Sequence, residues 1–407
     1  MLTLPYGTSY LGTHVPAVEF RLMELPESAS RCDAMDSLVN HSGLKKYLHK
    51  GTLCLVNDAT RPTRTRDVIE ACGFDGDFLV ATGAHSMPSD EEIRWILGHE
   101  IARSRVSIHS ALSSPCIDLG TTPRGTPVSL NAKIFDYPRI LIIGSVEPHY
   151  FAGYTGGRKG ILPGVASFRT IEANHALYFR PGAEILRLRG NPVHEDMIDA
   201  VSCLNIPIYT INMVLDASNE ISGIFCGELE PCHLEAAGLA RSIYAFPLEE
   251  QSDTVVTCAH YPMDVDLYQA QKALYNASLA TKPGGTIILI SQCRNGIGPR
   301  AFYDLLSSFD SPEEVIEYAG SNYVLGYHKA ANFAGLQRDF RIVIVSDLPA
   351  ESLHRVHLEA RSPSQIDTLL REELEAGHTV ACMPQGSITV PTGNLALDTG
   401  EDIIARS

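Results

Sequence analysis

The chain has 407 residues, of which 44% are hydrophobic and 20% charged, with a formal net charge of −16. That length exceeds what a single hydrophobic core usually organises, so two domains are expected. The acidic balance argues against a nucleic-acid partner, which would require a basic surface.

Neither a signal peptide nor a membrane span is expected. Charged residues occur throughout the first 51 positions, and no later stretch approaches the roughly 20 apolar residues that cross a bilayer. The ten cysteines stand apart, with no CxxC pair, a pattern that indicates neither a zinc ribbon nor a dithiol redox site. Scattered cysteines in such a chain predict a cytoplasmic protein.

Short apolar runs alternate with helical segments, which is typical of α/β proteins with mostly parallel strands. The expected strands cover residues 52–56, 77–81, 139–143, 206–212, 253–258, 285–290, 341–345 and 378–383. Helices are expected over residues 89–97, 264–279 and 312–319. The last of these begins with Pro and two acidic residues, which suit a helix N-terminus.

A polar run at residues 246–253 separates two apolar segments and predicts a domain boundary. We expect an N-terminal domain over residues 1–250, to which about 366–407 return, and a C-terminal α/β domain over residues 251–365. The predicted fold is therefore two α/β domains with mostly parallel sheets and an active-site cleft between them.

Two of the first expected strands end in polar segments. The strand at 52–56 is followed by Asn57-Asp58-Ala-Thr-Arg61-Pro-Thr, and the strand at 77–81 runs into Thr-Gly-Ala-His85. Arg61 at a strand end offers a planar guanidinium that matches a carboxylate. An Asp–Pro turn with a local ion pair would explain the first segment equally well, and a buried structural histidine would explain the second.

The most informative stretch, residues 147–164, follows the strand expected at 139–143. It reads Glu-Pro-His149-Tyr-Phe-Ala-Gly-Tyr-Thr-Gly-Gly-Arg-Lys159-Gly-Ile-Leu-Pro-Gly. Open α/β sheets bind ligands at the carboxyl ends of their strands, and glycines there allow close approach and expose amide groups to an anion. The stretch is neither a P-loop nor a GxGxxG fingerprint. A phosphate-binding turn with a surface lysine is the alternative.

Together these segments resemble the nickel-pincer-nucleotide lactate racemase family of 2-hydroxy acid racemases and epimerases. The resemblance spans roughly residues 50 to 330 and rests on five motifs in order. They are Asp-x-Thr-Arg-Pro at 58–62, Ala-Thr-Gly-x-His at 81–85, Pro-His-x-x-Ala-Gly-aromatic-Thr-Gly-Gly-x-Lys at 148–159, a histidine sixteen residues later at 175, and Tyr-Gln-x-x-Lys at 268–272.

The resemblance implies a cofactor and its attachment. Lys159 would carry a covalently tethered pyridinium nucleotide whose ring holds nickel in a pincer, and His175 would ligate the nickel. Gly156 and Gly157 would contact this cofactor, and Asp58 would contact it or orient its neighbours. Separate cofactor-biosynthesis enzymes would be needed to load it, and they are the expected protein partners.

It also implies how a small-molecule 2-hydroxy acid is bound. His85 and His149 would be the two catalytic bases, and Arg61 would hold the substrate carboxylate. Ser86 stands where an arginine often follows the first histidine in the family. The substrate-binding residues of the C-terminal domain would be Tyr268, Gln269 and Lys272.

Read without the resemblance, the segment at 268–272 allows two interpretations. Residues four apart on a helix share a face, so Tyr268 and Lys272 could reach a cleft together. A solvated amphipathic helix is the alternative. Residues 292–298 and His328 receive no role, because structural turns explain them.

The function implied is inversion of a lactate-like 2-hydroxy acid by reversible hydride transfer to the tethered nucleotide. The same chemistry on a larger acid, such as malate, an aromatic hydroxy acid or an aldonic acid, stays open. So does a non-catalytic binder of a small anion or nucleotide. A zinc hydrolase is disfavoured, because His85, His149 and His175 lack a closely spaced carboxylate ligand.

Overall fold

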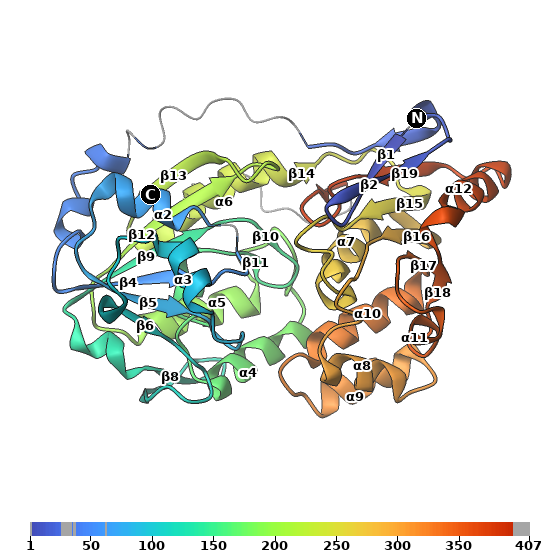
Figure 1. Cartoon of the computed structure of the whole chain (residues 1–407). Helices are drawn as coiled ribbons and strands as arrows, with labels where there is room; N and C mark the ends of the chain where they lie inside the picture. The colour runs from blue at the N-terminus through green and yellow to red at the C-terminus, as the bar shows by residue number, and fades with distance from the viewer. Residues whose placement is uncertain (1, 26–34, 36–37, 62, 394–407) are drawn as a thin grey trace. The chain divides into compact units, whose positions relative to one another are not determined.

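The computed structural model describes residues 2–25, 35, 38–61 and 63–393, and it divides into two compact units. Unit 1 comprises Met1–Pro26 and Tyr244–Ala396, and unit 2 comprises Glu27–Ile243 and Leu397–Ser407. Helices flank a six-stranded sheet in each unit (Figure 1). The fold is α/β with mostly parallel sheets, as the sequence predicts.

The sheet of unit 2 has the strand order β13-β12-β9-β4-β5-β6. Its strands are β4 (Thr52–Asn57), β5 (Asp77–Ala81), β6 (Val106–Ile108), β9 (Arg139–Ser145), β12 (Ile208–Leu215) and β13 (Ile221–Gly227). All neighbours pair in parallel except β12 and β13, which are antiparallel. The central strands are apolar along their length and buried, as a sheet covered on both faces requires.

The remaining elements of unit 2 are helices and two hairpins. The helices are α2 (Thr65–Cys72), α3 (Asp90–Leu97), α4 (Phe168–Ala176), α5 (Pro192–Ser202) and α6 (Leu229–Tyr244). The hairpins are β7 (Cys116–Thr121) with β8 (Pro127–Asn131), and β10 (Pro148–His149) with β11 (Gly153–Tyr154). Helix α3 begins with a capping box, in which Ser89 accepts from the Glu92 amide while Glu92 accepts from the Ser89 amide, so its N-terminal amides are satisfied.

The sheet of unit 1 is entirely parallel, in the order β18-β17-β16-β15-β19-β3. Its strands are β3 (Phe20–Leu22), β15 (Ser252–Cys258), β16 (Thr281–Ile290), β17 (Arg341–Val345), β18 (Glu359–Arg361) and β19 (Val380–Met383). A hairpin of β1 (Leu2–Tyr6) and β2 (Ser9–Thr13) packs into the same core, and β14 (Ala245–Phe246) pairs with β20 (Val390–Pro391).

The helices of unit 1 are α7 (Leu267–Ser278), α8 (Arg300–Ser307), α9 (Pro312–Ser321), α10 (Tyr327–Asp339), α11 (Ala350–His354) and α12 (Ile366–Glu375). Helix α7 begins three residues later than expected. The Asp266 carboxylate accepts from the Gln269 amide and caps it, while the carbonyls of Asp264 and Val265 accept from the amides of Cys293 and Asn295. Those loop bonds hold residues 264 and 265 outside the helix.

The structure divides the chain differently from the expected domains. Strand β19, expected to return to the N-terminal domain, pairs with β15 in the centre of the unit 1 sheet. Strand β3, near the start of the chain, then pairs with β19. Both segments therefore belong to the unit 1 sheet. Strand β19 pairs with β15 along one side and with β3 along the other.

Within the part of the chain that the structure describes, no helix combines the length and apolar character needed to span a membrane.

Candidate active site

The predicted site residues of unit 2 follow three neighbouring strands. Parallel strands β9, β4 and β5 lie side by side, so their carboxyl ends meet at one edge of the sheet. The chain proceeds from β4 to β5 on one side and later to β9 on the other. That reversal is the place where open α/β sheets form ligand-binding crevices.

The loops after β4 and β5 are joined by a hydrogen bond between Asp58 and His85. His85 Nδ1 lies 2.7 Å from Asp58 Oδ2, and Thr60 Oγ1 donates to Asp58 Oδ1 at 2.5 Å. Burial acts to raise the pKa of the Asp58 carboxyl, but the hydrogen bonds from His85 and Thr60 and the charges of His85 and Arg61 together lower that pKa. Asp58 is thus a buried anion, and it fixes the orientation of the His85 ring.

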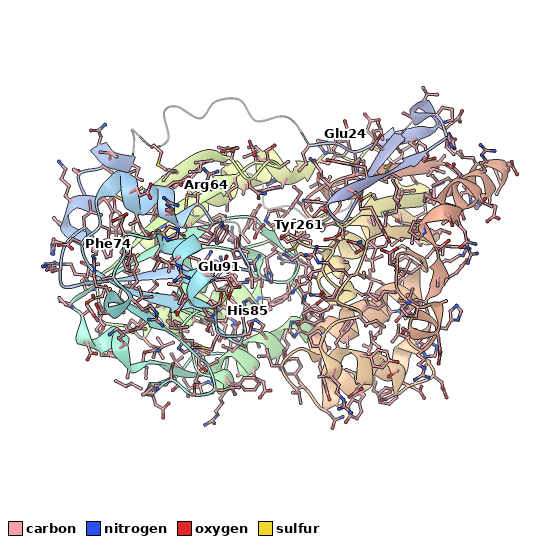
Figure 2. All side chains as sticks on the ribbon, in the orientation of Figure 1. Glu24, Arg64, Phe74, His85, Glu91 and Tyr261 are labelled. Atoms are coloured by element: carbon pink, nitrogen blue, oxygen red, sulfur yellow. The ribbon has the colours of Figure 1, made fainter. Side chains whose placement is uncertain are left out.

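The pairing also determines the tautomer of His85. A carboxylate can only accept, so the proton lies on Nδ1 and Nε2 keeps its lone pair. The His85 side chain is 54% exposed, whereas that of Asp58 is 7% exposed. Figure 2 shows His85 on the segment that leads from β5 to α3, where Glu91 is labelled. The exposed ring can meet a ligand, while its partner stays inside the protein.

Arg61 connects the β4 loop to the β9 loop. Its Nη1 donates to Glu147 Oε1 at 2.7 Å, and both side chains are largely buried. The sequence interpretation of Arg61 did not include this partner. A second link joins the same loops, because Asn57 donates to Thr63 Oγ1 and Thr63 contacts Ser145 Oγ at the end of β9.

The glycine-rich loop after β9 is shaped by packing. A Cβ on Gly156 would lie 2.5 Å from Val146 Cγ2, and one on Gly157 would lie 3.1 Å from the His233 side chain. The Gly157 amide, expected to face an anion, instead donates to Asn212 Oδ1 at 2.9 Å. Close packing is therefore the structural reason for these glycines, and their contact with a cofactor stays a prediction.

Arg158, beside Lys159, is fully buried and holds this loop together from within. Its guanidinium donates to the carbonyls of four residues and contacts His233 Nε2 at 2.7 Å; the carbonyls are those of Ala152, Tyr154, Thr155 and Gly156. Burial lowers the pKa of Arg158 to about 9, which still leaves it charged at neutral pH. A buried cation that binds several carbonyls fixes the backbone from which Lys159 projects.

Three predicted site residues surround the ring of Phe151. The His149 ring meets it edge-on at 4.6 Å between centroids, and the His175 ring does so at 5.2 Å. Lys159 Nζ lies 5.9 Å from the centroid of the same ring. Phe151 itself is buried, so it spaces the two histidines and the lysine around one rigid aromatic group.

His149 and His175 differ in their surroundings. His149 Nδ1 accepts from the Ala152 amide at 3.3 Å, so the neutral ring carries its proton on Nε2. Burial, and next the charge of Lys159, lower the pKa of His175 to about 3; His85 contributes in the same direction. His175 is therefore neutral and lies within electrostatic reach of both Lys159 and His85.

These residues fit the tethered, metal-holding nucleotide that the resemblance implies. Lys159 and His175 share one aromatic neighbour, and a neutral imidazole is the form that ligates a metal. No group of three or more His, Cys, Asp and Glu side chains able to hold a metal ion occurs among the described residues. His175 would thus be one ligand, and the nucleotide would have to supply the others.

The predicted substrate residues Tyr268, Gln269 and Lys272 lie on α7 in unit 1. Lys329 Nζ lies 3.6 Å from the centroid of the Tyr268 ring and donates to the Tyr268 carbonyl. Burial raises the pKa of Tyr268 to about 12, with a smaller contribution from Asp266. Their contact with substrate stays a prediction, as does the expected cleft.

Residues 292–298 and His328, which received no predicted role, form hydrogen bonds within unit 1. The loop after β16 donates from Cys293 and Asn295 to the segment before α7. His328, on α10, is buried and its Nδ1 lies 2.9 Å from Tyr323 Oη. The loop at 292–298 agrees with the expected structural turn, whereas His328 lies in a helix and not in a turn.

Sequence reasoning missed Glu147, Phe151 and Arg158, although all three lie inside the motif at 147–164. The sequence did offer a signal for each of them, because an acidic residue, an aromatic residue and a second cation stand within one glycine-rich loop. Their partners are distant in sequence or are backbone groups, so residue type alone does not identify them.

Comparisons with known proteins agree across both units. The lactate racemase N-terminal domain matches residues 23–185, and the lactate racemase C-terminal domain matches residues 248–390. A lactate racemase of Lactiplantibacillus plantarum is 32% identical over 290 residues, covering 69% of this chain and 68% of that protein. A lactate racemase of Thermoanaerobacterium thermosaccharolyticum is 29% identical over 340 residues, covering 77% and 80%.

Solved structures show the same similarity. The lactate racemase apoprotein from Thermoanaerobacterium thermosaccharolyticum superposes with a TM-score of 0.87 at 25% identity, covering 96% of this chain and 99% of that one. A protein from Thermotoga maritima has a TM-score of 0.71 at 18% identity, covering 91% and 100%, and shows the fold alone.

Proposed function

The chain belongs to the lactate racemase family of isomerases, and we propose that it interconverts the D and L forms of a small 2-hydroxy acid, with lactate as the expected substrate. One observation carries the proposal. An arginine and a histidine follow β4 and β5, and the loop after β9, which carries a second histidine and a lysine, is joined to that arginine through Glu147.

The reaction requires the hydrogen on carbon 2 to leave and return on the other face. That C–H is a poor acid, because the neighbouring carboxylate is already negative. Lys159 and His175 would hold the pyridinium nucleotide and its nickel. When bound, this group supplies a fixed acceptor for the hydrogen with its electron pair.

Arg61 binds the substrate carboxylate in this proposal. Arg61 follows Asp58 by three residues, its charge helps to lower the pKa of the Asp58 carboxyl, and its guanidinium bridges to the β9 loop through Glu147. A charge-assisted pair with a planar fork fixes both the position and the rotation of a carboxylate. That orientation places carbon 2 and its hydroxyl group on the histidine side of the site.

His85 removes the hydroxyl proton from one enantiomer. Its Nε2 lone pair accepts the proton, because the hydrogen bond to Asp58 occupies Nδ1. Asp58 holds the ring and stabilises the imidazolium that forms, as a buried carboxylate does for a catalytic histidine.

His149 acts on the other enantiomer. While Nδ1 accepts from the Ala152 amide, the neutral ring can only donate a hydrogen bond from Nε2–H to the carbonyl oxygen of the planar 2-keto acid. It gives a proton to that oxygen, as hydrogen returns to carbon 2, when the ring is protonated on both nitrogens; the neutral ring that remains is then the base for the reverse reaction. The inversion therefore starts with His85 neutral and His149 protonated, and it ends with those two states exchanged. A racemase needs such a pair, one base for each enantiomer.

Loading of the nucleotide requires cofactor-biosynthesis enzymes, which are the partners we propose. Every cysteine that the structure describes is free, which supports a reducing cytoplasmic setting. The net charge of −16 supports the absence of a nucleic-acid partner.

The test is to coexpress the chain with cofactor-biosynthesis enzymes and measure its intact mass, its nickel content and its activity on D- and L-2-hydroxy acids. The acids should include lactate, malate, an aromatic hydroxy acid and an aldonic acid. We expect added mass on Lys159, bound nickel, and inversion of lactate with retention of a deuterium placed on carbon 2.

Two variants serve as controls. Lys159→Ala should lack the added mass, and His175→Ala should keep the mass while losing nickel. A loaded protein that inverts none of the acids would refute the proposal. Complete exchange of the deuterium with solvent would refute the internal transfer of hydrogen.

A further inference from the structure

The Arg61–Glu147 pair places a negative charge directly against the proposed carboxylate anchor. Arg61 Nη1 donates to Glu147 Oε1 at 2.7 Å, and the two side chains are 23% and 18% exposed. The two residues come from different loops, after β4 and after β9. A substrate carboxylate on Arg61 must therefore share the guanidinium with Glu147.

Glu147 is itself held by backbone bonds. Its amide donates to Thr155 Oγ1 at 2.9 Å, and its carbonyl accepts from the Thr155 amide at 2.8 Å. Thr155 Oγ1 in turn donates to the Ser145 carbonyl at the end of β9. The backbone of Glu147 is thus anchored to the loop that carries Lys159, and its side chain reaches Arg61 from that fixed backbone.

The pair leaves one edge of Arg61 available. Only Nη1 has a side-chain partner, and among the described residues Nε and Nη2 have no protein acceptor. Nε–H and one Nη2–H point in parallel along one edge of a guanidinium, the geometry that binds both oxygens of a carboxylate. Glu147 therefore determines which edge of Arg61 is presented.

We propose that Glu147 is a positioning and specificity residue. It turns the Nε/Nη2 edge of Arg61 toward the substrate carboxylate, and its own charge restricts the site to 2-hydroxy acids with a single carboxylate. This inference rests on the proposed function and deepens it, because it names the substrate class.

Charge balance supports the restriction. In unit 2 the site contains the anions Asp58 and Glu147, and Arg61 is the cation left for substrate once Lys159 is used as the tether. One substrate carboxylate completes the pairing of Arg61. A second carboxylate, only a few bonds from the first, would meet Glu147 in a partly buried setting where like charges repel strongly.

The test compares lactate with malate on the loaded enzyme for the wild type, Glu147→Gln and Glu147→Ala. The Gln variant removes the charge but keeps an acceptor for Arg61 Nη1, whereas the Ala variant removes both. Asp199→Asn is the matched control, because Asp199 is a partly exposed carboxylate of the same unit that pairs with a different arginine, Arg124, at 2.6 Å.

We expect the wild type to prefer lactate, and Glu147→Gln to raise the malate-to-lactate ratio of kcat/KM by about tenfold or more. Glu147→Ala should raise KM for lactate by about tenfold with a much smaller effect on kcat, because Arg61 loses its orientation while the histidines are untouched. The Gln variant should raise KM less. Asp199→Asn should leave the ratio at the wild-type value.

The outcomes separate the two proposals. A loaded wild type that inverts no 2-hydroxy acid would reject the proposed function and this assignment together. If lactate is inverted but malate serves equally well, or if Glu147→Gln leaves the ratio unchanged, the specificity role alone is wrong. Equal values of KM in the Gln and Ala variants would reject the positioning role.

Discussion

His85 and His149 are held by different partners, and this difference determines where each ring carries its proton. A carboxylate accepts from His85 Nδ1, while a backbone amide donates to His149 Nδ1. In the neutral state, Nε2 of His85 is therefore a hydrogen-bond acceptor, whereas Nε2 of His149 is a donor. Such an asymmetric pair suits a reaction in which one ring takes a proton while the other donates a hydrogen bond to the substrate oxygen, and returns a proton to it when that ring is protonated.

We predict that His85→Ala and His149→Ala each lower the inversion rate by about 10²–10⁴-fold, the usual contribution of a general acid or base. The loss should be the same from D to L as from L to D, since the equilibrium constant of a racemisation is near one. Chiral analysis of the product from each pure enantiomer checks this. Full activity of either variant would contradict its assignment as a catalytic residue.

At the scale of elements, the loop from β10 to Lys159 owes its shape to contacts with distant parts of unit 2. Asn212 on β12 and His233 on α6 both contact it. Gly156 has a φ of 79°, and a Cβ there would also approach the Ser145 carbonyl at 3.1 Å. The loop is a packed part of the core, and the lysine is presented from a rigid base.

We predict that Gly156→Ala destabilises unit 2 more than Gly125→Ala does. Gly125 has a φ of 91° with nothing near its Cβ position, so its variant suffers mainly backbone strain of about 1–2 kcal/mol. Gly156→Ala should add about 1–3 kcal/mol from overpacking. Urea unfolding of both variants measures the difference, and equal free energies of unfolding would show that the packing argument is wrong.

At the scale of the whole molecule, buried histidines link stability to pH. His194 and His233 are stacked, with 6.1 Å between ring centroids, and both are buried. Burial, followed by the charge of Arg158, lowers the pKa of each well below its ordinary value. Both rings are therefore neutral in the folded protein at neutral pH.

The direction of the pH effect follows from those lowered values. Below a pH of about 6.5 the unfolded chain binds protons that the folded protein does not, so stability falls as the pH drops from 7 toward 5. Each such histidine contributes about 1.4 kcal/mol per pH unit in that range. The free energy of unfolding at pH 7, 6 and 5 measures the slope.

His194→Phe should flatten this slope by about the contribution of one histidine, even if the variant is less stable overall. His99→Asn, at an exposed position, is the control and should keep the wild-type slope. An unchanged slope in His194→Phe would mean that His194 does not take up a proton on unfolding.

The sequence by itself determined much of the architecture and the order of the site motifs. Long apolar runs predicted β4, β5, β9 and most central strands of unit 1, because buried parallel strands are hydrophobic along their length. The polar segments after three of those strands then had to meet at one edge of a sheet. Local pattern was sufficient there, since the signal and the structure involve the same residues.

Tertiary structure decided the features that depend on distant partners. Arg61 and Glu147 are 86 residues apart. Strand β19, near the end of the chain, pairs with β3, near its start. Arg158 received no role from the sequence, and its buried guanidinium contacts His233, 75 residues away. No local pattern encodes such contacts, because they form only once the chain has closed around them.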